Sequence, residues 1–147
     1  AARLVPYLDG LIVTDADRAL LSAAAPLVQE RMQLLGETRG LLAFLFTPDA
    51  ELVVEDDARP GADGAEVLTG AIAALEPLDD WSTASIEAAL RAVLFEACAM
   101  MPRLAFGPLR AAISGRRISP PLFESMELLG RESSLTRIRA LLASLSN

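Results

Sequence analysis

Apolar residues recur at the spacing of an α-helix along nearly the whole chain, and this periodicity limits the possible folds more than any other feature. In residues 86–97, Ile86, Leu90 and Leu94 follow one another at intervals of four and fall on one helical face. No segment shows the strict alternation of apolar and polar residues that indicates a half-buried strand. The sequence therefore predicts an all-α fold.

Residues that start and stop helices divide the first half of the chain. Thr14 followed by Asp17 has the pattern of a capping box, which predicts that a helix begins there. Pro26 is expected to begin a second helical run, because proline is favoured in the first turn. A third helix is predicted from about residue 37 to residue 46, since the residue before Pro48 is disfavoured in helical geometry.

The second half has clearer helix ends. Gly115 is expected to stop one helix in a left-handed conformation. Pro108 either bends that helix or sits in its first turn. Ser119 is expected to cap a short helix that starts at Pro120 and ends at Gly130. Further helices are predicted at residues 67–75, 86–97, 103–114 and 135–145.

The best candidate for a domain boundary is a turn-rich segment near the middle. Residues 51–57 are acidic, and Arg59-Pro60-Gly61-Ala62-Asp63-Gly64 follows them. Proline and glycine in such density interrupt regular structure. We therefore predict a helical bundle of two subdomains, residues 1–59 and 60–147.

Composition excludes several classes of function. The 147 residues are 52% hydrophobic, which is enough for a core, but no window approaches the about 18 apolar residues of a membrane span. The first residues resemble no signal peptide, so we expect a cytoplasmic protein without membrane association. Because the chain has no histidine and one cysteine, Cys98, it lacks the usual zinc ligand sets and the common nucleophile pairs. We expect no metal and no cofactor in this chain.

Two acidic clusters could be mistaken for a metal or acid-base site. Residues 55–57 and 79–80 lie in expected loops and lack a calcium-loop pattern or a second carboxylate at helical spacing. Solvated surface charge is the better interpretation.

Charge is distributed unevenly along the chain. All thirteen basic residues are arginine, and the net charge is −7. Residues 1–102 carry six Arg and seventeen Asp or Glu, whereas residues 103–147 carry seven Arg and three Glu, net +4. A polyanionic partner is therefore expected to contact the last third.

One stretch carries a specific resemblance to a known family. It reads Arg103-Leu-Ala-Phe-Gly-Pro-Leu-Arg110, then Gly115-Arg-Arg-Ile-Ser-Pro-Pro-Leu-Phe-Glu124, then Glu127-Leu-Leu-Gly-Arg-Glu132. In order and spacing this resembles the C-terminal, all-helical anticodon-binding region of bacterial-type glutamyl-tRNA synthetases, which are class I aminoacyl-tRNA synthetases. Weaker matches around Arg31 and Arg91 extend the resemblance over most of the chain.

The resemblance implies a set of tRNA-contacting residues around residues 110–122. Proteins read RNA sequence mainly on unstacked loop bases, through hydrogen bonds and through stacking on planar groups such as guanidinium. Two prolines stiffen this connection, and we expect the Ser119 hydroxyl and the Leu122 side chain to be exposed in it. The alternative is that Ser119 only caps a helix and that the arginines are solvated. The candidate anticodon-binding residues are Arg110, Arg116, Arg117, Ser119, Pro120, Leu122 and, in the first subdomain, Arg31.

Arg31 is the weakest member of this set. The family resemblance implies an arginine that reads the wobble base there, but the local match is short. A surface pair with Glu30 on a solvated helix face is the favoured interpretation of Arg31.

The implied function is recognition of the tRNA(Glu) anticodon stem-loop on behalf of a separate catalytic domain, with the protein acting as a monomer. Enzymes of this family activate glutamate with ATP and magnesium through nucleotide-binding motifs that are absent here, so we assign no catalytic residue to this chain. A helical protein-protein interaction module without RNA binding is the main alternative, and an autonomous enzyme is disfavoured.

Overall fold

The computed structural model describes residues 14–28, 38–97 and 102–146, and within these ranges the regular structure is entirely helical. The all-α prediction is confirmed. The α-helices are α1 (Asp15–Val28), α2 (Thr38–Phe46), α3 (Gly64–Leu75), α4 (Thr83–Arg91), α5 (Pro102–Ser114), α6 (Leu122–Leu129) and α7 (Arg131–Leu145). Two short 3-10 turns, η3 (Asp49–Glu51) and η4 (Asp56–Ala58), lie between α2 and α3, and a π-helical turn, η5 (Ala92–Ala97), continues α4.

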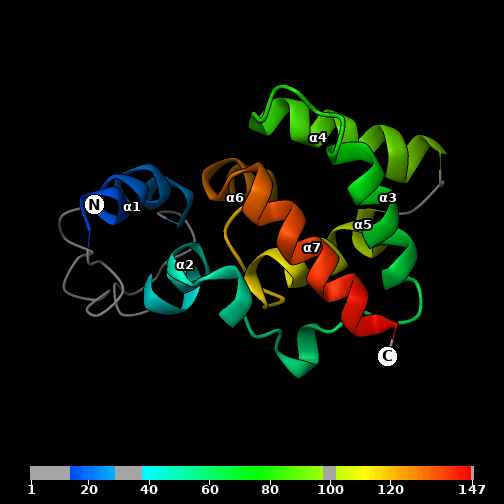
Figure 1. Cartoon of the computed structure of the whole chain (residues 1–147), viewed down its shortest axis with the longest axis horizontal. Coiled ribbons are helices and arrows are strands. Elements are labelled where there is room, and N and C mark those ends of the chain that lie inside the picture. Colours follow the sequence, from blue (N-terminus) through cyan, green and yellow to red (C-terminus); the bar gives the residue numbers. More distant parts are fainter. Residues whose placement is uncertain (1–13, 29–37, 98–101, 147) are drawn as a thin grey trace.

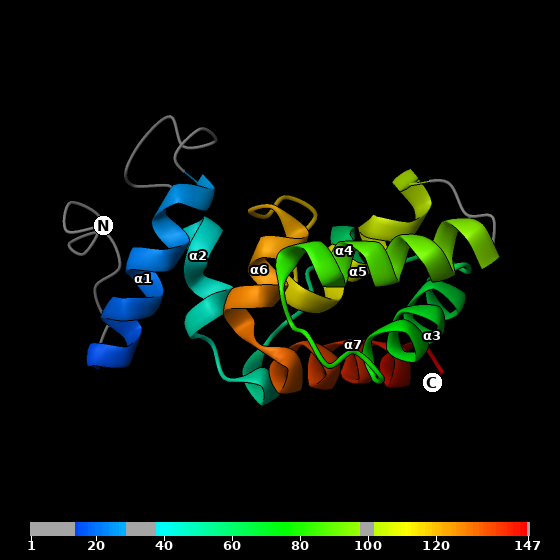
Figure 2. The same ribbon diagram turned by 90° about the horizontal axis from the view of Figure 1, so that it is seen from above.

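The helices pack around one core. Figures 1 and 2 both show α1 beside α2 at one end of the molecule, with α3 at the other end. α6 lies between these ends and contacts α1, α2, α4 and α5, while α7 packs along α3 and α5. The buried apolar side chains include Leu21 and Leu42 from the first half and Leu68, Met126 and Ile138 from the second. The division into subdomains at residues 59 and 60 remains a prediction.

The first helix begins as predicted but ends later. The Thr14 amide donates to the Asp17 carboxylate at 2.8 Å, and the Asp17 amide donates to the Thr14 hydroxyl at 3.1 Å, which completes the capping box. The prediction that Pro26 begins a new helix is wrong, because α1 continues through Pro26 to Val28. A proline inside a helix removes one backbone hydrogen bond to the turn before it, which weakens the helix locally without having to end it.

The other helices in the described ranges agree well with the periodicity. α2, α3, α5 and α7 contain the predicted segments, and α4 with η5 covers residues 86–97. Pro108 lies inside α5, and Gly115 ends that helix with φ of +75°. No helix in the described ranges has both the length and the apolar character needed to cross a membrane.

The start of α6 differs from the prediction. Ser119 does not cap this helix, which begins at Leu122 with Pro121 before it. The α-helical region is disfavoured for a residue that precedes proline, so Pro121 disfavours Pro120 as the first helical residue. The Ser119 hydroxyl donates instead to the carbonyl oxygen of Pro120 at 3.0 Å.

A buried arginine, Arg137 of α7, connects the two halves of the chain. Its Nη1 donates to the carbonyl oxygens of Phe44 at 2.9 Å and Ile113 at 2.8 Å. Its Nη2 donates to the carbonyl oxygen of Thr47 at 2.8 Å, and its Nε lies 2.6 Å from the Asp49 carboxylate. The ends of α2 and α5 are therefore held together by one side chain, just before the segment that carries the candidate site.

Candidate nucleic-acid interface

The connection between α5 and α6, residues 115–121, is held against an extended part of the first half. We call it the 115–121 loop. Gly115 has φ of +75°, and a Cβ atom there would lie 2.3 Å from the carbonyl oxygen of Val53, so only glycine fits. The Glu55 amide donates to the carbonyl oxygen of Gly115 at 2.8 Å. These contacts fix where the loop leaves α5.

The Arg116 guanidinium forms an ion pair and a hydrogen bond with other parts of the protein. Its Nε lies 3.3 Å from the Glu55 carboxylate, and its Nη1 donates to the carbonyl oxygen of Gly40 at 2.5 Å. A Cβ atom on Gly40 would lie 2.9 Å from that Nη1, so the guanidinium packs closely on the first turns of α2. Arg116 thus ties the 115–121 loop to α2, and its predicted contact with tRNA stays a prediction.

Arg117 and Ile118 form the exposed tip of the 115–121 loop. Among the residues that the structure describes, the Arg117 side chain has no hydrogen-bond or ion-pair partner. Ile118 is 72% exposed. The tip therefore presents one cation and one apolar surface to solvent.

Three predicted site residues are buried. Ser119 and Leu122 are each only 4% exposed, and Pro120 is buried between them. The expectation that the Ser119 hydroxyl and Leu122 are exposed is wrong, because Leu122 begins α6 and joins the hydrophobic core. In this structure these residues fix the shape of the 115–121 loop, and their predicted contact with an anticodon base is untested.

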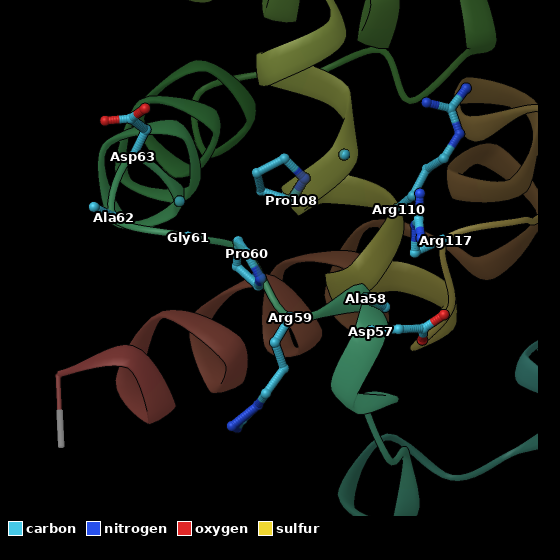
Figure 3. Close-up of a pocket in the computed structure, with 12 residues that line it drawn as sticks. Asp57, Ala58, Arg59, Pro60, Gly61, Ala62, Asp63, Pro108, Arg110 and Arg117 are labelled. Carbon is cyan, nitrogen blue, oxygen red and sulfur yellow. The ribbon is translucent and has the colours of Figure 1, made fainter.

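Arg110 and Arg117 line a pocket of about 540 Å³ between the turn after η4 and the middle of α5. In Figure 3, Pro60 and Pro108 face each other across it, and Arg59 points away from Arg110. Asp57 lies on the side of the pocket where Arg117 enters. The pocket thus brings Arg110 and Arg117 close to a segment about 50 residues earlier in the sequence, which contributes Asp57 and Asp63 to its lining.

A second, smaller hollow of about 330 Å³ adjoins the first. Asp57 and Arg117 line both, so these two side chains separate them. The remaining lining residues of the smaller hollow are Glu55, Arg116 and Ile118. Sequence reasoning missed Asp57 and Ile118 as parts of a site, because only the fold brings the acidic turn against the 115–121 loop.

The charge asymmetry along the sequence does not become a wide basic face. Arg116 pairs with Glu55, Arg137 with Asp49 and Arg139 with Glu76, so the acidic half neutralises three arginines of the last third. The two hollows likewise contain both signs of charge: Arg110 lines the larger one, Arg117 lines both, and carboxylate residues line each of them.

The remaining predicted positions carry less information. Arg31 lies outside the described residues. In the described ranges, no three acidic or cysteine side chains come together as metal ligands.

At Asp80, hydrogen bonds from the hydroxyls of Ser85 and Ser82, at 2.5 and 2.8 Å, lower the pKa of the carboxyl group below its ordinary value of 3.8. These bonds hold together the start of α4, where the Ser82 hydroxyl also accepts from the Ser85 amide.

Comparison with known proteins decides the family. The family model described as "Anticodon binding domain" matches residues 1–142. The chain belongs to this anticodon-binding domain family. Glutamate-tRNA ligases from Kocuria rhizophila and Kineococcus radiotolerans are 59% identical over 151 residues and 55% identical over 152 residues, covering 98% and 97% of this chain. The chain spans 30% of the length of each relative.

A solved structure shares the fold of this anticodon-binding domain. The crystal structure of a glutamate tRNA ligase from Elizabethkingia meningosepticum superimposes with a TM-score of 0.76, covering 98% of this chain and 28% of that chain. Its sequence is 19% identical, so the likeness concerns the fold alone.

Proposed function

We propose that this chain recognises the anticodon stem-loop of tRNA(Glu) as part of a glutamate-tRNA ligase. The observation that carries the proposal is the match of an anticodon-binding domain over residues 1–142, together with relatives that are glutamate-tRNA ligases more than 50% identical to the chain. This domain recognises the anticodon, and a catalytic domain outside this chain attaches glutamate to the tRNA.

The local chemistry of the surface supports this proposal. Arg110 and Arg117 bring guanidinium groups to the larger pocket, where they can pair with phosphates or with base edges. Ile118 lies beside Arg117 on a stiff loop, so the surface offers an apolar contact for a base next to a cation. Arg116, Ser119, Pro120 and Leu122 support the same surface by holding the 115–121 loop in place.

Further parts of the proposal concern the whole enzyme. The catalytic domain uses ATP with magnesium to activate glutamate, and the enzyme works in the cytoplasm as a monomer. The partners of this chain are then tRNA(Glu) and its own catalytic domain. We assign no catalytic residue within the 147 residues.

A gel-shift titration of the chain with tRNA(Glu) at several salt concentrations tests the proposal. With about three arginine-phosphate contacts, affinity is expected to fall roughly twenty- to fortyfold between about 50 and about 200 mM salt, because each contact releases counterions. Absence of any shift at low salt contradicts RNA binding. Salt-insensitive binding to a purified catalytic domain, without RNA binding, favours the alternative of a protein-protein interaction module.

A further inference from the structure

The smaller hollow has features that anticodon binding in general does not explain. It is lined by Arg116, Arg117 and Ile118 from the 115–121 loop and by Glu55 and Asp57 from the acidic segment. Carboxylates repel phosphate, so they would weaken a surface that only binds phosphate. The mixture of one apolar wall, cations and anions indicates a ligand with a flat face and both donors and acceptors on its edge.

Ile118 is held so that it can serve as the apolar wall. A single exposed hydrophobic residue is common on protein surfaces and carries little meaning alone. Here the backbone is fixed on both sides, by Gly115 docked on Val53 and by Pro120 followed by Pro121. Little conformational entropy is then lost when a ligand packs on the side chain, which favours binding.

The charged groups of the hollow differ in whether they already have an ion-pair or hydrogen-bond partner within the protein. Glu55 and Arg116 pair with each other at 3.3 Å. In the described part of the chain, neither the Asp57 carboxylate nor the Arg117 guanidinium has a hydrogen-bond or ion-pair partner. A carboxylate only accepts hydrogen bonds, and a guanidinium only donates them. A ligand that satisfies both must bring at least one N–H donor and one acceptor.

We propose that this hollow receives one unstacked nucleobase of the tRNA anticodon loop, that Ile118 packs on its face, and that Asp57 selects a base with an exocyclic amino group. The proposal rests on the proposed function and specifies part of its recognition surface. An amino group donates to the carboxylate, whereas the carbonyl oxygen that uracil carries in place of the cytosine amino group would face it with like charge. Arg117 donates to an acceptor on the base or to the adjoining phosphate.

The test uses the 147-residue chain and a set of tRNA(Glu) anticodon hairpins. At each loop position in turn, the hairpins carry a base with an exocyclic amino group or its counterpart with a carbonyl at that place, such as cytosine and uracil. At one position, the wild-type chain is expected to prefer the amino-bearing base about five- to a hundredfold, as for other good base-edge contacts. In Asp57→Asn the preference at that position falls close to one, because an amide both donates and accepts. Loss of a negative charge raises affinity for all hairpins, so the ratio is the informative quantity.

Matched variants control for charge and for exposed apolar surface. Asp56→Asn makes the same charge change at a neighbouring exposed residue that lines neither hollow, and it is expected to keep the preference. Ile118→Ser is expected to weaken binding of all hairpins severalfold without changing the salt dependence. Val53→Ser removes an apolar side chain that is 78% exposed outside the hollow, and it is expected to bind as wild type does. Thermal melts of all four variants confirm that they fold.

Four results would overturn the proposal. If the wild type binds hairpins but Ile118→Ser matches Val53→Ser, or if Asp57→Asn keeps the base preference, the hollow holds no base while the proposed function stands. If Ile118→Ser binds RNA normally but binds a purified catalytic domain more weakly, the hollow contacts protein. If the wild type binds no hairpin at all, the proposed function fails and this inference fails with it.

Discussion

The Nε atom of Arg137 and the Oδ1 atom of Asp49 lie 2.6 Å apart, although 88 residues separate them in sequence. The Arg137 side chain is almost fully buried, and its other donors reach three carbonyl oxygens at the ends of α2 and α5. Backbone carbonyls at helix ends have no partner within the helix and need one elsewhere. Arg137 therefore caps two helices at once and joins the first half of the chain to the helix that leads into the 115–121 loop.

Replacing Arg137 by Met should strongly destabilise the protein. The change leaves Asp49 without its partner and leaves the carbonyls of Phe44, Thr47 and Ile113 without a donor. Breaking a buried ion pair by removing one partner costs about 3–5 kcal/mol. Urea unfolding of the wild type and the variant measures the difference in free energy of unfolding.

Arg139→Met is the matched control, because Arg139 lies on the same helix and pairs with Glu76 while both side chains are half-exposed. An exposed pair contributes only about 0–1 kcal/mol. If Arg137→Met unfolds at the same urea concentration as Arg139→Met, Arg137 does not hold the two halves together.

The start of α4 gives a prediction about acid stability. Because hydrogen bonds from Ser85 and Ser82 lower the pKa of Asp80 in the folded state, the charged carboxylate stabilises the fold at pH values above its ordinary pKa of 3.8. This contribution is lost as the pH falls below 3.8 and through the lowered folded-state pKa. Asp80→Asn should therefore melt below the wild type at neutral pH, and the difference should disappear in acid.

Asp79→Asn changes the net charge in the same way at the adjacent exposed residue and serves as the control for Asp80. Melting temperatures of the three proteins across the acid range decide the question. A difference between Asp80→Asn and wild type that stays constant down to the lowest pH would show that the Asp80 carboxylate does not act through its charge.

Arg110→Ala should reduce discrimination between tRNAs more than it reduces stability. An arginine aimed at a base edge contributes about 1–3 kcal/mol of discrimination. The quantity to measure is the ratio of dissociation constants for tRNA(Glu) and an anticodon-substituted tRNA, because a phosphate contact would weaken both alike. We expect this ratio to fall towards one in Arg110→Ala.

The control for Arg110 is Arg18→Ala, which removes an exposed arginine from α1 outside both hollows. Thermal melts of both variants separate loss of recognition from loss of folding. A folded Arg110→Ala protein that distinguishes the two tRNAs as well as the wild type does would exclude Arg110 as an anticodon reader.

Local sequence patterns predicted most of the helices because helix ends depend on neighbouring residues. The Thr14 and Asp17 capping box and the left-handed Gly115 are set by contacts within a few residues, and both were predicted correctly. At Ser119, two local preferences predict different helix starts. Serine favours a helix cap, but Pro121 disfavours helical geometry at Pro120, and the second preference prevailed.

The candidate site was less predictable because it depends on contacts between distant segments. Arg116, predicted to contact RNA, is largely occupied by Glu55 and Gly40, which are 61 and 76 residues away. Nothing near Arg116 in the sequence indicates these partners. The position of Arg137 in the sequence does indicate internal partners. It falls on the buried face of α7 between Ser134 and Leu141, where a buried arginine needs hydrogen-bond or ion-pair partners.

The location of RNA binding gives a further prediction. Chemical-shift changes on adding the tRNA(Glu) anticodon hairpin should concentrate in residues 103–139, with an additional set at residues 55–57, because that turn faces the 115–121 loop. Changes concentrated on residues 67–80 instead would place the RNA on α3 and the turn after it, outside the pocket that Arg110 and Arg117 line.

The most direct measurement is the affinity of the wild-type chain for tRNA(Glu) compared with the same tRNA carrying a substituted anticodon, at one fixed salt concentration. If this domain reads the anticodon, the substituted tRNA should bind at least about fivefold more weakly, which corresponds to the loss of one base-edge contact. Equal affinities for the two tRNAs would contradict anticodon recognition by this chain.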